Sequence, residues 1–211
     1  MRRKQIADLV GATELPKFRD VTQADLDRQA AGSPLDVVPL ESLPIRVVIA
    51  VDPGQRSGVA WIRGDGTTAA LAVNHLDTYG TDDLAGILDS HLCSADVWCF
   101  ACEKPVNRRG PWDAYRRWRG AAQALARQRA RAAGVRYRKP QEMLWTCLKW
   151  RPWVGIPPRT HGDVAKEMAL VKAAGFLFAH SRSYDEAEAI CLGVAVAGRA
   201  KVHPEEFRWV P

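Results

Sequence analysis

Residues 47–58 read Val-Val-Ile-Ala-Val-Asp-Pro-Gly-Gln-Arg-Ser-Gly, and this stretch decides the fold. Its first five residues are apolar and mostly β-branched, a pattern that is typical of a central strand. Asp52-Pro53-Gly54 ends the strand, because proline and glycine interrupt regular secondary structure. A carboxylate is therefore predicted at the end of a buried strand, where the backbone is fixed and the side chain reaches the edge of the sheet.

The rest of the chain alternates between strand-like and helix-like patterns. Three strands joined by short turns, over 47–51, 59–62 and 68–76, predict an antiparallel meander. The elements expected after them are a helix at 81–93, a strand at 97–102, a helix at 112–133, a strand at 135–138, and helices at 140–149, 162–174 and 184–197. We expect an α/β fold with a mixed five-stranded sheet, three antiparallel strands followed by two parallel ones, flanked by helices.

Length and composition fit one folded domain with an appendage. Of the 211 residues, 47% are hydrophobic and 26% are charged; we expect an N-terminal extension and linker over 1–44 and the folded domain over 45–211. No apolar run approaches the roughly 20 residues of a membrane span, and none follows the basic start, so we expect a cytoplasmic protein. Five cysteines without an export signal predict reduced thiols, and Cys99 and Cys102 should face opposite sides of their strand.

The net charge of +6 is concentrated in one part of the chain. Residues 104–139 carry 12 basic side chains and 1 acidic one, whereas residues 45–103 carry 3 basic and 8 acidic ones. This arrangement fits a metal-using enzyme that acts on a polyanion, because basic groups neutralise phosphates while carboxylates hold cations. The residues expected to contact nucleic acid are Arg108, Arg109, Arg116, Arg117, Arg119, Arg138, Lys139 and Arg159.

Three features of the sequence place carboxylates where they can meet. Asp52 ends the first strand, and Glu103 directly follows the apolar strand at 97–102. Asp185 and Glu188 are three residues apart on an otherwise apolar helix, so they share one face. Each feature has an ordinary alternative, since turn aspartates and acidic first turns of helices are common. Together they indicate one cluster of hard oxygen ligands that suits Mg²⁺ or Mn²⁺.

The motifs also resemble, in order and over residues 45–200, those of the RuvC family of Holliday junction resolvases. The match consists of Asp52-Pro53-Gly54 with Gly58, Glu103, Arg138 to Met143, Lys166, and Tyr184 to Ile190. Glu188 departs from the family pattern, which has aspartate there. The segment 145–160 is longer than the family pattern and rich in tryptophan, and the stretch before Lys166 is also altered.

The resemblance implies an RNase H-like fold and a metal-dependent endonuclease of DNA recombination and repair, which resolves four-way junctions in branched DNA. It implies that Asp52, Glu103, Asp185 and Glu188 hold a pair of Mg²⁺ or Mn²⁺ ions, and that Lys166 offsets charge on the reacting phosphate. Cleavage would leave 5′-phosphates, and paired symmetric cuts would require a homodimer.

Three aromatic or histidine features leave alternatives open. His161 is either a proton or phosphate contact or an ordinary loop histidine. Trp150 and Trp153, in the loop expected at 150–160, either stack on splayed bases or pack against protein. The basic helix carries an apolar stripe that fits a dimer contact, which we expect, or core packing; it consists of Tyr115, Trp118, Ala122 and Leu125.

Other functions compete with junction resolution. A less selective flap or branch endonuclease of the same fold would need the same acids. Sugar kinases and actin-like ATPases also begin with a strand followed by Asp-x-Gly, but the chain has neither their second phosphate loop nor their adenosine motif. A non-catalytic nucleic-acid-binding protein would explain the arginines but not the four acids at strand and helix ends.

Overall fold

A computed structural model describes residues 46–105, 109–176 and 183–211. The extension expected over 1–44 and the candidate Arg108 lie outside these residues. The sheet has five strands in the order β3-β2-β1-β4-β5. They are β1 (Arg46–Asp52), β2 (Ser57–Arg63), β3 (Thr68–Val73), β4 (Val97–Glu103) and β5 (Glu142–Trp145). The first three strands pair antiparallel, and β1, β4 and β5 run parallel, which confirms the predicted fold class.

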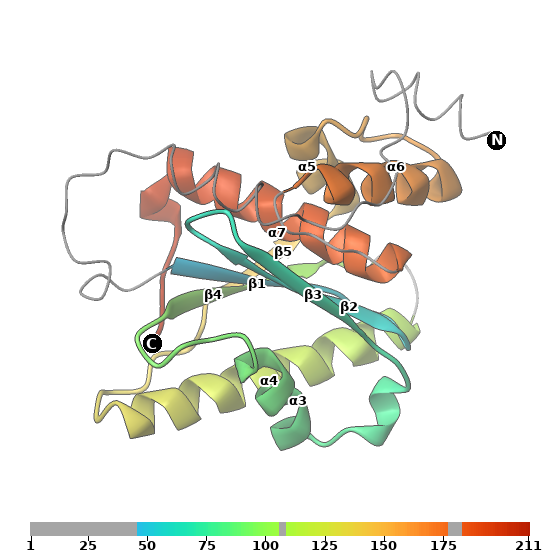
Figure 1. Ribbon diagram of the computed structural model, residues 1–211. Coiled ribbons are helices and arrows are strands. Elements are labelled where there is room, and N and C mark those ends of the chain that lie inside the picture. Colours follow the sequence, from blue (N-terminus) through green and yellow to red (C-terminus); the bar gives the residue numbers. More distant parts are fainter. Residues whose placement is uncertain (1–45, 106–108, 177–182) are drawn as a thin grey trace, which may run out of the picture.

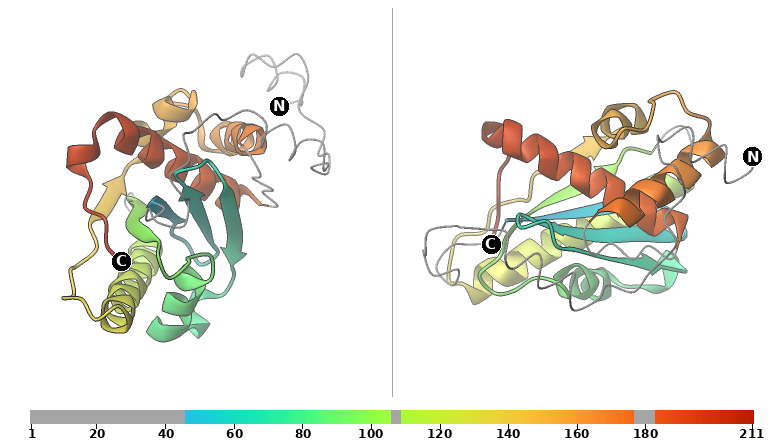
Figure 2. Two further views of the ribbon diagram at one scale, coloured as in Figure 1. Left: turned by 60° about the vertical axis from the view of Figure 1, so that its left-hand side comes forward. Right: turned by 45° about the horizontal axis from the view of Figure 1, so that its top comes forward.

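Helices cover both faces of the sheet, so that the domain has three layers (Figure 1, Figure 2). One face carries α3 (Thr81–Asp89) and α4 (Arg109–Ala132), and the other carries α5 (Cys147–Trp150), α6 (Gly162–Gly175) and α7 (Tyr184–Val202). The described part of the chain also contains the short 3-10 helices η2 (Leu76–Thr78), η3 (Arg151–Val154) and η4 (Pro204–Glu206). Within the described ranges, no helix is long and apolar enough to cross a membrane.

Strand alternation divides the apolar residues between two cores. Along β1, Val48 and Ala50 pack toward α7, whereas Val47, Ile49 and Val51 pack toward α3 and α4. The same alternation puts Cys99 in the first core and Cys102 in the second, as predicted for residues three apart on a strand. All five cysteines are free thiols. The same alternation determines toward which helix layer the side chains of Asp52 and Glu103 point.

The fifth strand is not where the sequence analysis predicts it. Residues 135–139 are exposed and form no strand, and β5 begins at Glu142, inside the helix expected at 140–149. β5 pairs parallel with the end of β4, with Glu103 opposite Trp145, and Trp145 is buried in the α7 core. The prediction was wrong because a strand of four residues is decided by its partner in the sheet rather than by its own pattern. Only the single turn of α5 remains of the expected helix.

The apolar stripe of α4 is part of this chain's own core. Leu125 is 1% exposed and Trp118 is 0% exposed, and both belong to the cluster beneath the sheet, together with Tyr115 and Ala122. The predicted dimer contact through this stripe is therefore wrong, and the alternative of core packing is confirmed. Helical periodicity shows that one face is apolar, but it does not show what covers that face.

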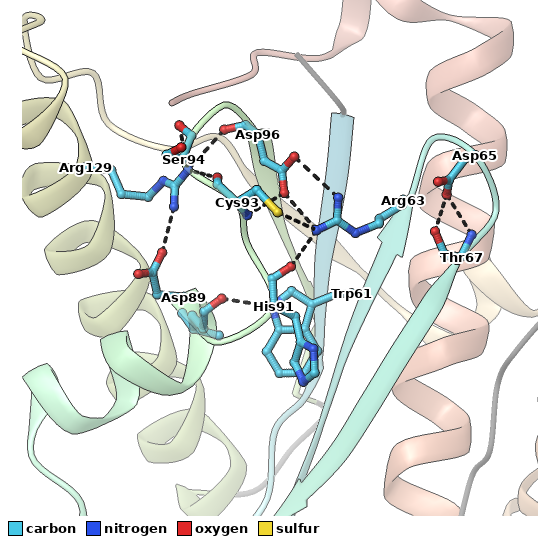
Figure 3. A network of polar contacts seen from close by, with 11 residues as sticks. Trp61, Arg63, Asp65, Thr67, Asp89, His91, Cys93, Ser94, Asp96 and Arg129 are labelled. Atoms are coloured by element: carbon cyan, nitrogen blue, oxygen red, sulfur yellow. Dashed lines mark hydrogen bonds and ion pairs between the residues drawn. The ribbon is translucent and has the colours of Figure 1, made fainter. Parts of the chain in front are cut away.

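The end of the sheet away from Asp52 is closed by a network of ion pairs (Figure 3). Arg63, at the end of β2, binds the buried Asp96 with an N–O distance of 2.9 Å and donates to the carbonyl of His91. Arg129 of α4 pairs with Asp89 of α3 at 2.8 Å. This network joins the turn after α3 to the sheet and to α4, so Arg129 acts in the fold rather than as a free basic group.

Candidate active site

Asp52 and Glu103 end neighbouring parallel strands. Val51 of β1 lies opposite Cys102 of β4, so the next residues, Asp52 and Glu103, follow at equivalent positions of the two strands. Because Val51 and Cys102 face the α3 and α4 layer, strand alternation directs both acids toward α7. The carboxyl ends of parallel strands thus bring two carboxylates side by side beneath one helix.

The turn after Asp52 is held by hydrogen bonds. Ser57 Oγ accepts from the amide of Gly54 at 3.1 Å and donates to the Gly54 carbonyl at 2.9 Å. The indole of Trp118 in α4 donates to Ser57 Oγ at 3.0 Å, within a fully buried environment. These contacts tie the short β1–β2 turn to the layer below the sheet. The backbone that carries Asp52 is consequently fixed from both sides.

Gly58 lets the start of α7 rest directly on the sheet. It lies opposite Asp52 in the β1–β2 register. A Cβ atom at Gly58 would lie 1.9 Å from the carbonyl oxygen of Asp185 and 2.8 Å from the amide nitrogen of Glu186. Only a residue without a side chain allows this approach. The glycine therefore sets the height of Asp185, and with it the first turn of α7, above the strand that carries Asp52.

Burial and neighbouring charges raise the pKa values of two of the predicted acids, Asp52 and Glu103. Burial raises the pKa of Asp52 well above its usual value, and the charges of Glu103, Glu188 and Asp185 raise it further. Lys166, half-buried on α6, lowers this pKa. Burial together with the charge of Glu188 raises the pKa of Glu103 to about 7. The charges of Glu103, Asp185, Glu188 and Lys166 thus all act on Asp52 at the end of β1.

Basic side chains compensate part of this negative charge. Arg56, in the turn after Asp52, pairs with Asp185 at 3.0 Å. Arg151 lies 3.7 Å from a carboxylate oxygen of Glu188. Hard carboxylate ligands from two strands and one helix suit Mg²⁺ or Mn²⁺ in chemical type. Their oxygens are spread, however: within the described ranges, the one set of three side chains of ligand type with all ligand atoms within 4.8 Å of one another is His203, Glu205 and Glu206, of which the two glutamates are exposed.

The basic residues expected to bind nucleic acid differ in how free they are. Arg116, Arg117, Arg138 and Arg159 are exposed, although Arg116 pairs with Asp113 on the same helix. Arg119 and Lys139 both contact Glu142, at 2.8 Å and 3.2 Å. Arg109 lies at the start of α4, where its side chain is not described. Solvent-facing arginines of α4 and of the segment before β5 therefore remain the candidates for phosphate contact.

Two residues of the site were not assigned a role there by sequence analysis. Trp150 is completely buried and donates a hydrogen bond to Glu103, so it packs against protein and does not stack on bases. Arg151, next to it, is also buried. Trp153 is 42% exposed and His161 is exposed at the start of α6, which leaves their roles open. In the sequence, the only indication of a role for these two residues was that a tryptophan and an arginine are adjacent in a segment rich in apolar residues.

No family model matches the sequence, and no curated protein matches it. Among solved structures, the chain is similar to the Thermus thermophilus RuvC structure, with 16% identity and a TM-score of 0.43 over 74% of this chain and 96% of that chain. It is also similar to T. thermophilus RuvC in complex with a Holliday junction substrate, with 15% identity and a TM-score of 0.45 over 74% of this chain and 95% of that chain. At such identities, these structures assign no role to an individual residue of this chain.

Proposed function

We propose that this chain is a divalent-cation-dependent endonuclease that cuts branched DNA, with the four-way junction as its preferred substrate and 5′-phosphates at the cut ends. The observation that carries the proposal is that Asp52 of β1 is buried near three further acids, Glu103 of β4 and Asp185 and Glu188 of α7, whose charges add to burial in raising its pKa. Arg56, Arg151 and Lys166 offset only part of the charge of these acids, and divalent cations would supply the remaining compensation.

Asp52, Glu103, Asp185 and Glu188 would hold the cations in this proposal. Bound Mg²⁺ or Mn²⁺ would activate a water molecule and stabilise the leaving oxygen of the phosphodiester. Lys166, which already lowers the pKa of Asp52, would offset negative charge on the phosphate. Exposed arginines such as Arg117 and Arg138 would contact phosphates away from the cut.

We further propose that a homodimer performs paired cleavage, since two symmetric cuts require two sites. The partner would dock outside the α4 stripe, because that stripe is buried within each chain. Sedimentation of the protein, alone and with a junction, measures this directly.

The test is cleavage of matched four-way junction, flap and linear DNA with Mg²⁺ or Mn²⁺. Asp52→Asn should abolish cutting while DNA binding stays equal or tightens, because the variant repels phosphate less. Asp82→Asn, in the exposed first turn of α3, serves as the matched control and should cut normally. An Asp52→Asn protein that cuts as well as the wild type would refute the mechanism, and equal cutting of all three DNAs would refute junction selectivity.

A further inference from the structure

The segment between β5 and α6 contributes two consecutive side chains to the acid cluster. Trp150 is 0% exposed, and its indole nitrogen donates a hydrogen bond to Oε2 of Glu103 at 3.0 Å. Arg151 is 8% exposed, and its guanidinium lies 3.7 Å from Oε1 of Glu188. One short segment therefore contacts an acid from β4 and an acid from α7.

Local structure holds the pair in place. The Arg151 guanidinium lies over the ring of Trp150, 5.6 Å from its centre, and donates to the Thr160 carbonyl at 3.4 Å. The amide of Ile156 donates back to the Arg151 carbonyl at 2.9 Å, across Gly155, which has a φ of 73°. Glycine adopts this left-handed conformation without strain. The two side chains are thus presented by an ordered turn packed on the core.

Arg151 lies close to Glu188, but not all of its guanidinium nitrogen atoms make hydrogen bonds. Its Nε is buried and has no hydrogen-bond partner among the described residues, and 3.7 Å to Glu188 is a long ion pair. Attraction between the two charges therefore dominates over hydrogen bonding. A divalent cation that reaches Glu188 would be repelled by the same guanidinium.

We propose that Trp150 and Arg151 are positioning residues with opposite effects on cation binding, an inference that rests on the proposed metal-dependent function. Trp150 orients the Glu103 carboxylate as a ligand, so it favours the cation-bound protein. Arg151 is a resident counter-cation of Glu188, so it stabilises the cation-free protein more than the cation-bound one. By thermodynamic linkage, a group that stabilises the cation-free state weakens cation binding.

The experiment titrates the full-length protein with MnCl₂ by calorimetry and measures its melting in EDTA. Trp150→Phe keeps an aromatic ring but removes the donor, and it should bind Mn²⁺ about tenfold more weakly. Arg151→Met should melt roughly 5 °C lower in EDTA and bind Mn²⁺ about tenfold more tightly. Arg151→Lys retains the charge and should recover most of the melting temperature.

Matched controls separate position from residue type. Trp153→Phe changes a tryptophan that is 42% exposed on the same segment, and Arg136→Met removes an exposed charge; both should bind Mn²⁺ as the wild type does. If Arg151→Met does not fold in EDTA, Mn²⁺ titration followed by circular dichroism replaces melting. Refolding on Mn²⁺ supports the counter-cation role, and no refolding overturns it.

The outcomes distinguish this inference from the proposed function. If Trp150 and Arg151 had only a structural role, both Trp150→Phe and Arg151→Met would lose Mn²⁺ affinity. A loss of affinity in both variants, with a wild type that binds Mn²⁺, therefore overturns the inference but not the proposed function. Equal effects of Trp150→Phe and Trp153→Phe overturn the role of the Glu103 hydrogen bond. A wild-type protein that takes up no Mn²⁺ overturns the metal-dependent function itself.

Discussion

Replacing Gly58 by alanine should displace the first turn of α7 from the acid cluster. The new Cβ would lie 1.9 Å from the Asp185 carbonyl oxygen, whereas ordinary contacts begin at about 3.4 Å. Both groups belong to backbone or are attached directly to it, so no side chain can rotate away. The helix start must therefore move by about 1.5 Å, because a packed interior does not absorb such an overlap. Asp185 would move with it, away from Asp52.

A displacement on the order of 1 Å at a reacting centre can lower the rate about 100-fold, and overpacking typically costs about 1–3 kcal/mol of stability. Single-turnover cleavage of a four-way junction with Mn²⁺ measures the first effect, and thermal melting measures the second. Gly86→Ala is the control, since nothing lies within 4 Å of its added Cβ on α3. Wild-type cleavage and melting in Gly58→Ala would refute the account of how α7 is positioned.

Two further perturbations test the electrostatics and the core. Burial raises the pKa of Glu103 from 4.5 to about 7, so the cation-free folded protein keeps a proton that the unfolded chain has lost. As the pH rises from about 6 to 7.5, the stability of the cation-free protein should consequently fall by about 1 kcal/mol, or roughly 3 °C in melting temperature. Saturating Mn²⁺ should remove this loss. A melting temperature in EDTA that does not change with pH would contradict the prediction. Leu125→Glu places an unpaired charge at a position that is only 1% exposed. The variant should therefore be unfolded at room temperature, or its melting temperature should be at least about 10 °C lower than that of the wild type. A folded monomer with a normal melting temperature would restore the dimer interpretation of α4.

The predicted fold succeeded where a pattern is local and long. The apolar run before Asp52 and the run before Glu103 became β1 and β4, and the periodic stretch at 112–133 became α4. β5 was missed because its four residues gain their stability from pairing with β4, more than 35 residues earlier in the chain. The helix expected to stop at Gly198 continues to Val202, and the ring of Trp153 lies 3.6 Å from where a Cβ atom at Gly198 would be.

The candidate acids could be proposed from the sequence because Asp52 and Glu103 end apolar strands and Asp185 and Glu188 lie on one face near the start of a helix. The side chains that modulate them could not, since Trp150 meets Glu103 across 47 positions of sequence and Arg151 meets Glu188 only after α7 has folded over the sheet. Contacts of this kind leave no periodic pattern in the sequence. The role of Gly58 was equally hidden, because sequence shows that a glycine is present but not which backbone approaches it.

The two ends of the sheet differ in how far their buried carboxylates are paired with basic side chains and hydrogen-bond donors. At the end shown in Figure 3, Asp96 is 2% exposed and receives a guanidinium at 2.9 Å and the amide of Cys93 at 2.8 Å. At the other end, the same fold brings Asp52 and Glu103 together with two acids of α7, and the pKa of both strand-end acids is raised. Arg56, Arg151 and Lys166 offset only part of the negative charge at this second end. The remaining negative charge is the feature on which the proposed cation site at this end of the sheet rests.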